Sequence, residues 1–399
     1  MRKLNRLFTV TLSVTATAGF ALYGCQSLWD SQLVADPNNC VVNNVPCEVG
    51  FVCDVATKHC VPEVGDMAGV DAAGSGIDGG TMIDMSSIDM AIDPSPFIVQ
   101  PTSVNTSDRL NAIYGKAGGQ VWAVGENSTL LSLENNAKSW QLRSPSGVPQ
   151  PTSYHSVWTF DGSEVWLGGS GFIGALALPA LSLRNALNAG VPSGMPVLGN
   201  VISAWGYDAA NVFFTDEAGR VYKTNPVQNP VKVDGCNFFE LSGLTQAIWG
   251  TGADKVWTVG DIKSPYTSVK KITTAACGSF IAVPNNLGTM VFRRIHGIDE
   301  SKIWLTSGSS VYTLNAATPS FALQAVPSNR QLNGIWAITP TNVWAVGDNG
   351  TIIHYDGTAW TPVLPPVTKL SQNLRAVWAA NANDVYIVGD GGTILKKTK

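Results

Sequence analysis

The sequence predicts an all-β protein whose main domain is a seven-bladed β-propeller. One observation is a pair of aromatic positions, eight residues apart, that occurs seven times after residue 110. A second is the distance from one pair to the next, 40 to 47 residues, which is typical of propeller blades. A third is composition, because 40 glycines and only 14% charged residues suit short strands joined by tight turns.

The pairs define seven repeats, and in one of them a histidine takes the first position. The first positions are Tyr114, Trp158, Trp205, Trp249, His296, Trp336 and Trp378, and the second positions are Trp122, Trp166, Phe213, Trp257, Trp304, Trp344 and Tyr386.

Each repeat is expected to form four short strands, A to D, and repeat six shows them best. Strand A leads to Trp336, strand B surrounds Trp344, and strands C and D follow. Asn349-Gly350 and Asp356-Gly357 are predicted two-residue hairpin turns, because Asn, Asp and Gly tolerate positive φ. β-branched and aromatic residues on both strand faces fit a sheet packed between two others.

The last repeat has no strand D of its own, since the sequence ends shortly after its strand C. Phe97–Gln100 supplies a candidate, because Phe97 stands 17 residues ahead of Tyr114, as Trp140 and Trp360 stand 18 ahead of their next first aromatic. We expect this N-terminal strand to complete the seventh blade and close the ring, which removes two open sheet edges.

The W…VW-x-VG-x-x-G-T-I pattern over residues 97–399 resembles the propeller superfamily that includes the photosystem II stability factor and the sortilin-type and sialidase-type propellers. This resemblance implies a fold and no particular activity. The sequence has no clear S-x-D-x-G-x-T-W box of the sialidase kind and no Trp-Asp signature at a strand end.

Residues 1–24 are predicted to be a secretory signal peptide, with three early cations ahead of an apolar stretch, Leu7–Leu22. About 16 apolar residues fall short of the roughly 20 that a transmembrane helix needs. Leu22-Tyr23-Gly24-Cys25 resembles a bacterial lipobox, which implies acylation of Cys25 and a membrane-anchored tether at 25–34. The alternative is ordinary cleavage with Cys25 incidental. By the same resemblance, Gln26 favours the outer membrane over the inner membrane.

Residues 35–62 are predicted to form a small module held by disulfides, since four cysteines lie within 21 residues of an exported chain. These are Cys40, Cys47, Cys53 and Cys60, and three connectivities stay open. Zinc is the weaker alternative, because no C-x2-C pair is present. Cys236 and Cys277 occupy equivalent places in adjacent repeats and are predicted to form a further disulfide.

Residues 63–96 contain seven acidic residues and no Lys or Arg, which predicts a flexible acidic linker. Residues 97–399 carry 21 basic and 18 acidic residues, so bulk charge excludes a nucleic-acid-binding domain. A monomer is expected. The lipobox, the Cys-rich stalk, the linker and the propeller together most resemble surface lipoproteins of myxobacteria.

The candidate ligand site is a polar column, formed by the residues three places before each first aromatic. Six of its seven members are polar, and they open strand A near the central channel. In repeat five, Arg294 replaces a small residue and His296 replaces the aromatic. The predicted ligand-binding residues are Asn111, His155, Gln246, Arg293, Arg294, His296, Asn333 and Arg375.

The Arg293-Arg294-x-His296 cluster would suit a carboxylate or a sulfated sugar, because guanidinium binds both in a bidentate manner. The alternative is that Arg294 pairs with a neighbouring acid and His296 is a packed core residue. Five repeats also carry an acid four residues past the second aromatic. We expect these side chains to bond the local turn backbone, with a binding ring as the alternative.

No nucleophile elbow, H-E-x-x-H motif, P-loop or metal-spaced cluster is present, so no catalytic residue, cofactor or metal is predicted. The sequence favours a non-enzymatic binding or scaffold module of the cell envelope, in the periplasm or at the surface, with a protein or glycan ligand. One alternative is a polysaccharide lyase or hydrolase that uses His155 with Arg293 or Arg375. Another is an assembly factor for outer-membrane or secretion machinery.

Overall fold

The computed structural model describes residues 51–54, 59–62, 96–100, 107–135, 137–148, 152–188, 199–225, 228–232, 245–260, 269–272, 280–281, 290–318, 320–366 and 370–398. The predicted lipidation site and four of the predicted disulfide cysteines lie outside these ranges: Cys25, Cys40, Cys47, Cys236 and Cys277. The chain divides into two compact units, Met1–Ser87 and Ile88–Lys399.

The first unit contains one described hairpin. Strand β1 (Phe51–Asp54) pairs antiparallel with β2 (His59–Pro62), and Cys53 lies directly opposite Cys60 in the register. No helix in the described part of the chain is long and apolar enough to cross a membrane.

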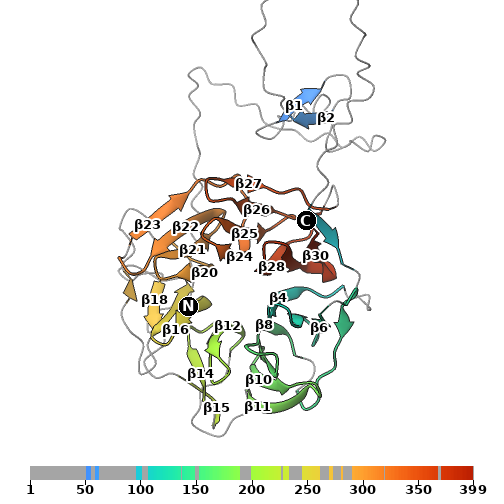
Figure 1. Ribbon diagram of the computed structural model, residues 1–399, viewed down its shortest axis with the longest axis vertical. Helices are drawn as coiled ribbons and strands as arrows, with labels where there is room; N and C mark the ends of the chain where they lie inside the picture. The colour runs from blue at the N-terminus through green and yellow to red at the C-terminus, as the bar shows by residue number, and fades with distance from the viewer. Residues whose placement is uncertain are drawn as a thin grey trace, which may run out of the picture. The chain divides into compact units, whose positions relative to one another are not determined.

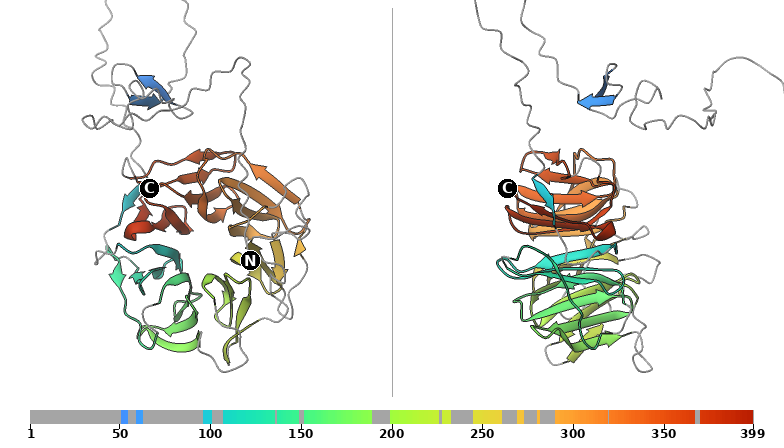
Figure 2. Two further views of the ribbon diagram at one scale, coloured as in Figure 1. Left: turned by 180° about the vertical axis from the view of Figure 1, so that it is seen from behind. Right: turned by 90° about the vertical axis from the view of Figure 1, so that its right-hand side faces the viewer.

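The second unit is a seven-bladed β-propeller, as predicted, and each blade is a four-stranded antiparallel sheet. The blades follow one another around a central channel in chain order (Figures 1 and 2), and β28 of blade seven contacts β4 of blade one. The strands of blades one to three are β4 (Leu110–Gly115), β5 (Val121–Gly125), β6 (Leu130–Leu133), β7 (Gln141–Leu142), β8 (Tyr154–Trp158), β9 (Glu164–Gly169), β10 (Phe172–Ala177), β11 (Ser182–Asn188), β12 (Val201–Asp208), β13 (Asn211–Asp216), β14 (Val221–Asn225) and β15 (Gln228–Lys232).

The remaining blades have the same arrangement, with strand A innermost. Their strands are β16 (Thr245–Gly252), β17 (Lys255–Gly260), β18 (Val269–Ile272), β19 (Phe280–Ile281), β20 (Arg294–Asp299), β21 (Lys302–Ser307), β22 (Ser310–Asn315), β23 (Ser320–Gln324), β24 (Leu332–Thr339), β25 (Asn342–Gly347), β26 (Ile352–Tyr355), β27 (Trp360–Pro362), β28 (Leu374–Asn381), β29 (Asp384–Gly389) and β30 (Ile394–Lys397), with β3 (Phe97–Val99) as the fourth strand of blade seven.

The constant spacing of eight residues follows from the strand register. In every blade the first and second aromatic positions are direct partners across strands A and B, as Trp336 is opposite Trp344. The second aromatics then fill the spaces between blades. Trp122 of blade one, for example, is 1% exposed and packs with Tyr154 and Leu167 of blade two. The core is therefore a set of inter-blade layers.

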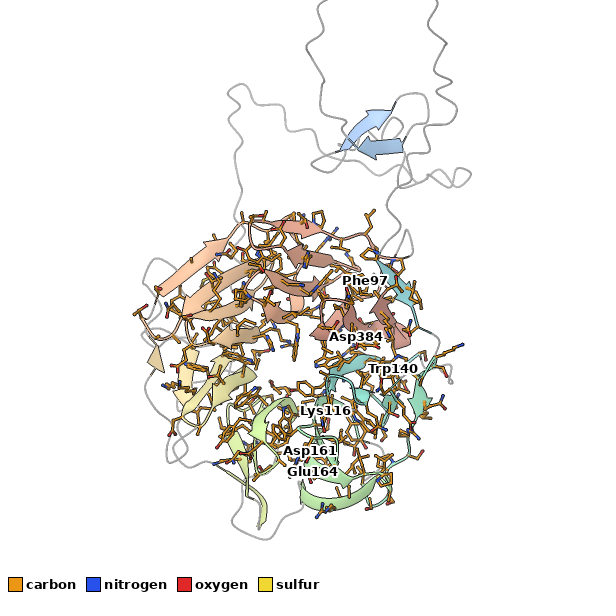
Figure 3. All side chains as sticks on the ribbon, viewed as in Figure 1. Phe97, Lys116, Trp140, Asp161, Glu164 and Asp384 are labelled. Atoms are coloured by element: carbon orange, nitrogen blue, oxygen red, sulfur yellow. The ribbon has the colours of Figure 1, made fainter. Side chains whose placement is uncertain are left out.

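The closing strand β3 confirms the predicted source of the missing strand D. It pairs antiparallel with β30, with Phe97 opposite Lys397. The Phe97 side chain is 1% exposed and packs edge-on against Trp344 of blade six, with ring centroids 5.4 Å apart. Figure 3 labels Phe97 on this strand. The seventh blade thus contains strands from both the beginning and the end of the propeller sequence.

The turn predictions for blade six are half right. Thr351 N–H donates to the Asp348 carbonyl, and Asn349 and Gly350 have φ of 53° and 68°, so the predicted two-residue turn is present. The turn predicted at Asp356-Gly357 is shifted by one residue, because Asp356 N–H donates to the Ala359 carbonyl and Gly357 and Thr358 lie between them. The Asp356 carboxylate accepts the backbone N–H groups of Thr358 and Ala359, which stabilises this turn.

Candidate binding site at the centre of the ring

The first aromatics of the repeats form a layer across the channel, which we call the aromatic layer. Neighbouring rings contact one another from Trp158 through Tyr114, Trp378, Trp336 and His296 to Trp249, with centroid distances from 3.9 to 6.4 Å. Tyr114 of blade one also reaches Trp336 of blade six, 5.9 Å away. Since blade seven lies between these two blades, the rings fill much of the channel at this level.

Glycine makes this close packing possible. A Cβ atom on Gly206 of blade three would lie 2.7 Å from the indole of Trp158 in blade two. On Gly297 of blade five it would lie 2.7 Å from the indole of Trp249 in blade four. Real Cβ atoms do not approach carbon so closely, so the residue after the first aromatic is small for a packing reason.

The starts of strands A surround a central cavity of about 180 Å³, bounded by the aromatic layer. All seven blades contribute to its wall. Arg294 and Arg375 are its charged members, and none of the described residues that line it is acidic. Four of the other predicted site residues also line it: Asn111, His155, Gln246 and His296. Arg293 and Asn333 are adjacent in sequence to lining residues.

The polar column has a regular partner fifteen residues later in the same blade. Arg375 donates from Nε and Nη2 to the two carboxylate oxygens of Asp390, both at 2.8 Å. Asn333 Nδ2 donates to Asp348 Oδ1 at 2.7 Å. The predicted bonds from these acids to the local turn backbone are therefore wrong, because strand A supplies the donors. The acids at the B–C turns hold the start of strand A in place.

Two asparagines of the column also join neighbouring blades. Asn111 Nδ2 donates to the Tyr154 carbonyl of blade two at 2.8 Å. Asn333 Nδ2 donates to the Leu374 carbonyl of blade seven at 3.0 Å. Each amide satisfies a backbone acceptor on the next blade, so these two side chains have a structural task besides any contact with a ligand.

His155 has both ring nitrogens engaged. Asn111 Nδ2 can only donate, so His155 Nδ1, 3.4 Å away, is the acceptor and Nε2–H donates to Ser170 Oγ at 3.2 Å. Burial lowers the pKa of His155, against the opposing effect of Glu217 and Glu126. The imidazole is therefore neutral and already hydrogen-bonded.

His296 takes the place of an aromatic residue and packs within the aromatic layer, as the alternative interpretation of the sequence predicted. Its ring stacks on Trp336 at 3.9 Å, and its Nδ1 accepts the backbone N–H of Ala337 at 3.0 Å. Burial lowers the pKa of His296 to about 3. The neutral ring must then carry its proton on Nε2, and this N–H has no acceptor among the residues described.

Arg294 differs in its partners from Arg375, the other charged residue that lines the cavity. Its Nη1 donates to the neighbouring Arg293 carbonyl at 2.8 Å, and it has no acidic partner within the described ranges. Burial lowers its pKa to about 10, with further effects from Arg293 and Arg375. The described residues show no acid paired with Arg294, and Asp261 of the neighbouring blade lies outside them, so the alternative that Arg294 pairs with an acid stays a prediction. The equivalent residues elsewhere are Ala112, Ser156, Ser203, Ala247, Gly334 and Ala376.

Arg293 lacks the partner that Arg375 has, because Gly308 stands fifteen residues after it, in place of an acid. Gln246 lines the cavity from blade four, and the described residues provide no hydrogen bond to its amide. Among the described residues, the donors without a described acceptor thus gather on blades four and five. These residues were predicted from the sequence, but the fifteen-residue pairing of their equivalents with acids in blades six and seven was not.

A second hollow, of about 540 Å³, lies between blades one and two. Its polar groups are matched within the protein. Arg143 pairs with Glu134 at 2.6 Å, and Lys116 donates to the Asp161 carbonyl at 3.1 Å. Lys116 and Asp161 are labelled in Figure 3. No cluster of His, Cys, Asp or Glu that could hold a metal ion is found among the described residues.

No protein-family model matches the chain, and no curated protein sequence matches it. Solved structures do resemble it. YCF48 bound to D1 peptide is 15% identical with a TM-score of 0.60, and the match covers 77% of this chain and 98% of that one. YCF48 from Cyanidioschyzon merolae is 17% identical with a TM-score of 0.59, over 76% and 98% of the two chains.

A lyase shares the fold equally well. Virginiamycin B lyase from Staphylococcus aureus is 13% identical with a TM-score of 0.61, and the match covers 76% of this chain and 99% of the lyase. Identities this low establish the architecture only, and this architecture hosts both binding proteins and enzymes. The chain is similar in fold to these seven-bladed propellers.

Proposed function

We propose that this protein is a lipid-anchored binding module of the bacterial cell envelope, which holds a ligand at its central cavity without transforming it. The observation that supports this most is the mismatch in the cavity wall. Arg294 and Gln246 line the cavity from blades five and four with donors for which the described residues provide no acceptor, apart from the Arg293 carbonyl, and the described wall offers no carboxylate. A ligand that supplies acceptors would satisfy them.

The state of the histidines favours binding over catalysis. A general base needs a free nitrogen and a pKa near the working pH. His155 has both nitrogens hydrogen-bonded, and the pKa of His296 is about 3. The fold neighbours include a propeller that holds a peptide, and this chain would use its ring in a similar way.

The anchor part of the proposal rests on the sequence. Cys25 is positioned for acylation at a lipobox-like site, and a Cys25→Ser variant should move to the soluble fraction. Retention of that variant on membranes after a high-salt wash would contradict lipid anchoring. The outer membrane is the proposed location.

The binding part is tested with the full chain carrying Cys25→Ser, incubated with panels of peptides and glycans. Calorimetry should detect binding, and mass spectrometry should recover the bound ligand unchanged. New reducing or unsaturated ends, or any cleaved ligand, would assign the protein to the lyases or hydrolases instead.

A further inference from the structure

We infer that the central cavity is a carboxylate-binding site in which Arg294 is the anchor, and that it takes a carboxylate attached to a small apolar or aromatic group. This inference rests on the proposed function and specifies its ligand class. It starts from a side chain whose charge the described structure leaves uncompensated.

Arg294 is a partly buried cation. A charge that loses hydration is normally paired with an opposite charge, because the lost hydration is otherwise unrecovered. The charged groups that contribute to the lowering of its pKa are Arg293 and Arg375, both positive. Three acids act on Arg375, namely Asp390, Asp348 and Glu126, and Arg375 binds both carboxylate oxygens of Asp390. An anion beside Arg294 would meet a positive charge that pairs with no acid among the described residues.

Arg294, His296 and Gln246 line the same cavity and carry hydrogen-bond donors. A guanidinium has five N–H donors in a planar fork, and a described acceptor takes one of those of Arg294. His296 adds an Nε2–H from the same strand, β20, and Gln246 adds an amide from the adjacent strand β16. A carboxylate accepts up to four hydrogen bonds through two oxygens, so these groups could share it.

The size and the lining of the cavity indicate which class of anion would fit it. A volume of about 180 Å³ is a little larger than a cavity of about 150 Å³ that accommodates benzene. Part of the wall is apolar, with Ile113, Ile248 and Val377 beside the rings of Trp249 and Trp336. An inorganic dianion would leave this apolar surface unmatched, and a sulfated sugar would bring hydroxyl groups to it. A phenyl or branched aliphatic carboxylate would match both parts of the wall.

Two sources could present this chemistry: the C-terminal residue of a peptide, or a free organic acid. The shared requirement is a carboxylate on a small apolar body. The hollow between blades one and two is a poorer candidate, because Arg143 pairs there with Glu134 and Lys116 donates to the Asp161 carbonyl.

The test uses the full chain carrying Cys25→Ser, with calorimetry and thermal unfolding as measurements. The probes are 3-phenylpropionate, a short peptide ending in phenylalanine, the same peptide as its C-terminal amide, and sulfate. We expect 3-phenylpropionate or the peptide acid to bind and raise the Tm, and the amide and sulfate to bind at least about tenfold more weakly. Which acid binds more tightly identifies the source.

Three variants connect binding to the site. Arg294→Ala introduces the residue that blades one, four and seven have at this position, and it should weaken carboxylate binding about 10- to 100-fold. Arg294→Met keeps the volume of the side chain and should have the same effect, which guards against a folding defect in the first variant. Arg330→Ala, at an exposed arginine of another loop, should bind as the parent does.

Unchanged carboxylate affinity in both Arg294 variants would overturn the inference, as would equal affinity for the peptide acid and its amide. Tight sulfate binding with no carboxylate binding would also overturn it. In those cases the proposed binding function still stands if another ligand from the panels binds unchanged, and it fails separately if a ligand is cleaved.

Discussion

Arg375 and Asp390 form a bidentate ion pair within blade seven, with both hydrogen bonds at 2.8 Å and about a quarter of each side chain exposed. Arg293 occupies the same place in blade five, where Gly308 replaces the acid. Two arginines in one column of the repeat therefore have different tasks. The first belongs to the framework of the ring, and the second has no acidic partner among the residues that the structure describes.

This difference predicts opposite results for two equivalent substitutions. Arg375→Ala should lower the free energy of unfolding by about 1–3 kcal/mol, because it leaves a partly buried carboxylate with weaker compensation. Arg293→Ala should change it by less than about 0.5 kcal/mol, as ordinary surface substitutions do. Urea unfolding of the two variants measures both values. Equal losses would show that the column has one role throughout.

The same pair predicts a pH dependence. Burial alone would raise the pKa of Asp390, but hydrogen bonds and charge from Arg375, together with Arg109, outweigh it and lower that pKa. A carboxyl whose folded pKa is depressed contributes stability above its unfolded pKa, near 3.8, and loses it as the pH falls through the folded value. Asp390→Asn should thus be less stable than the parent at pH 7. The gap should shrink below about pH 4. A gap that is constant with pH would contradict this account.

The closing strand predicts a strong contrast between adjacent residues. Phe97 is 1% exposed against Trp344, whereas Ile98 is 45% exposed. Phe97→Ala should cost about 3–5 kcal/mol by opening a cavity between blades six and seven. Ile98→Ala should cost far less, about 0.5 kcal/mol or below. Thermal unfolding of the pair measures the contribution of β3 to ring closure, and similar Tm values for the two variants would argue against it.

The aromatic layer predicts a requirement for glycine at chosen positions. Gly206→Ala should destabilise the protein by about 1–3 kcal/mol, because the new Cβ meets the Trp158 indole at 2.7 Å. Gly252→Ala is the matched control on the neighbouring innermost strand, since nothing lies within 4 Å of a Cβ there. Denaturant unfolding with tryptophan fluorescence compares them. If Gly206→Ala were as stable as the control, the contact between the blades would be looser than the structure shows.

The fold was predictable because the pattern that indicates it, the pair of aromatic positions, lies within a single repeat. The two aromatic positions are opposite each other across strands A and B, so their spacing of eight is fixed by a hairpin register. The closing strand was predictable for a similar reason, because Phe97 occupies the position that Trp140 and Trp360 occupy in their blades. Repetition makes such positions visible in a single sequence.

The site was predictable only in part, because its character depends on partners distant in sequence. The sequence shows that Arg294 breaks a column of small residues. It does not show that the acids of the B–C turns bond Asn333 and Arg375 and leave Arg294 without one among the described residues. The pairing is set by the relative positions of strand A and the B–C turn, which three-dimensional packing determines.

The position of β3 also determines how mechanical load would travel through the molecule. Any pull on the chain ahead of Pro96 enters the ring through a three-residue strand whose one sheet partner is β30. At the end nearest the applied force, the Pro96 carbonyl accepts hydrogen bonds from Thr398, and Phe97 follows opposite Lys397. Tension on the N-terminal side would therefore act on blade seven before the other blades.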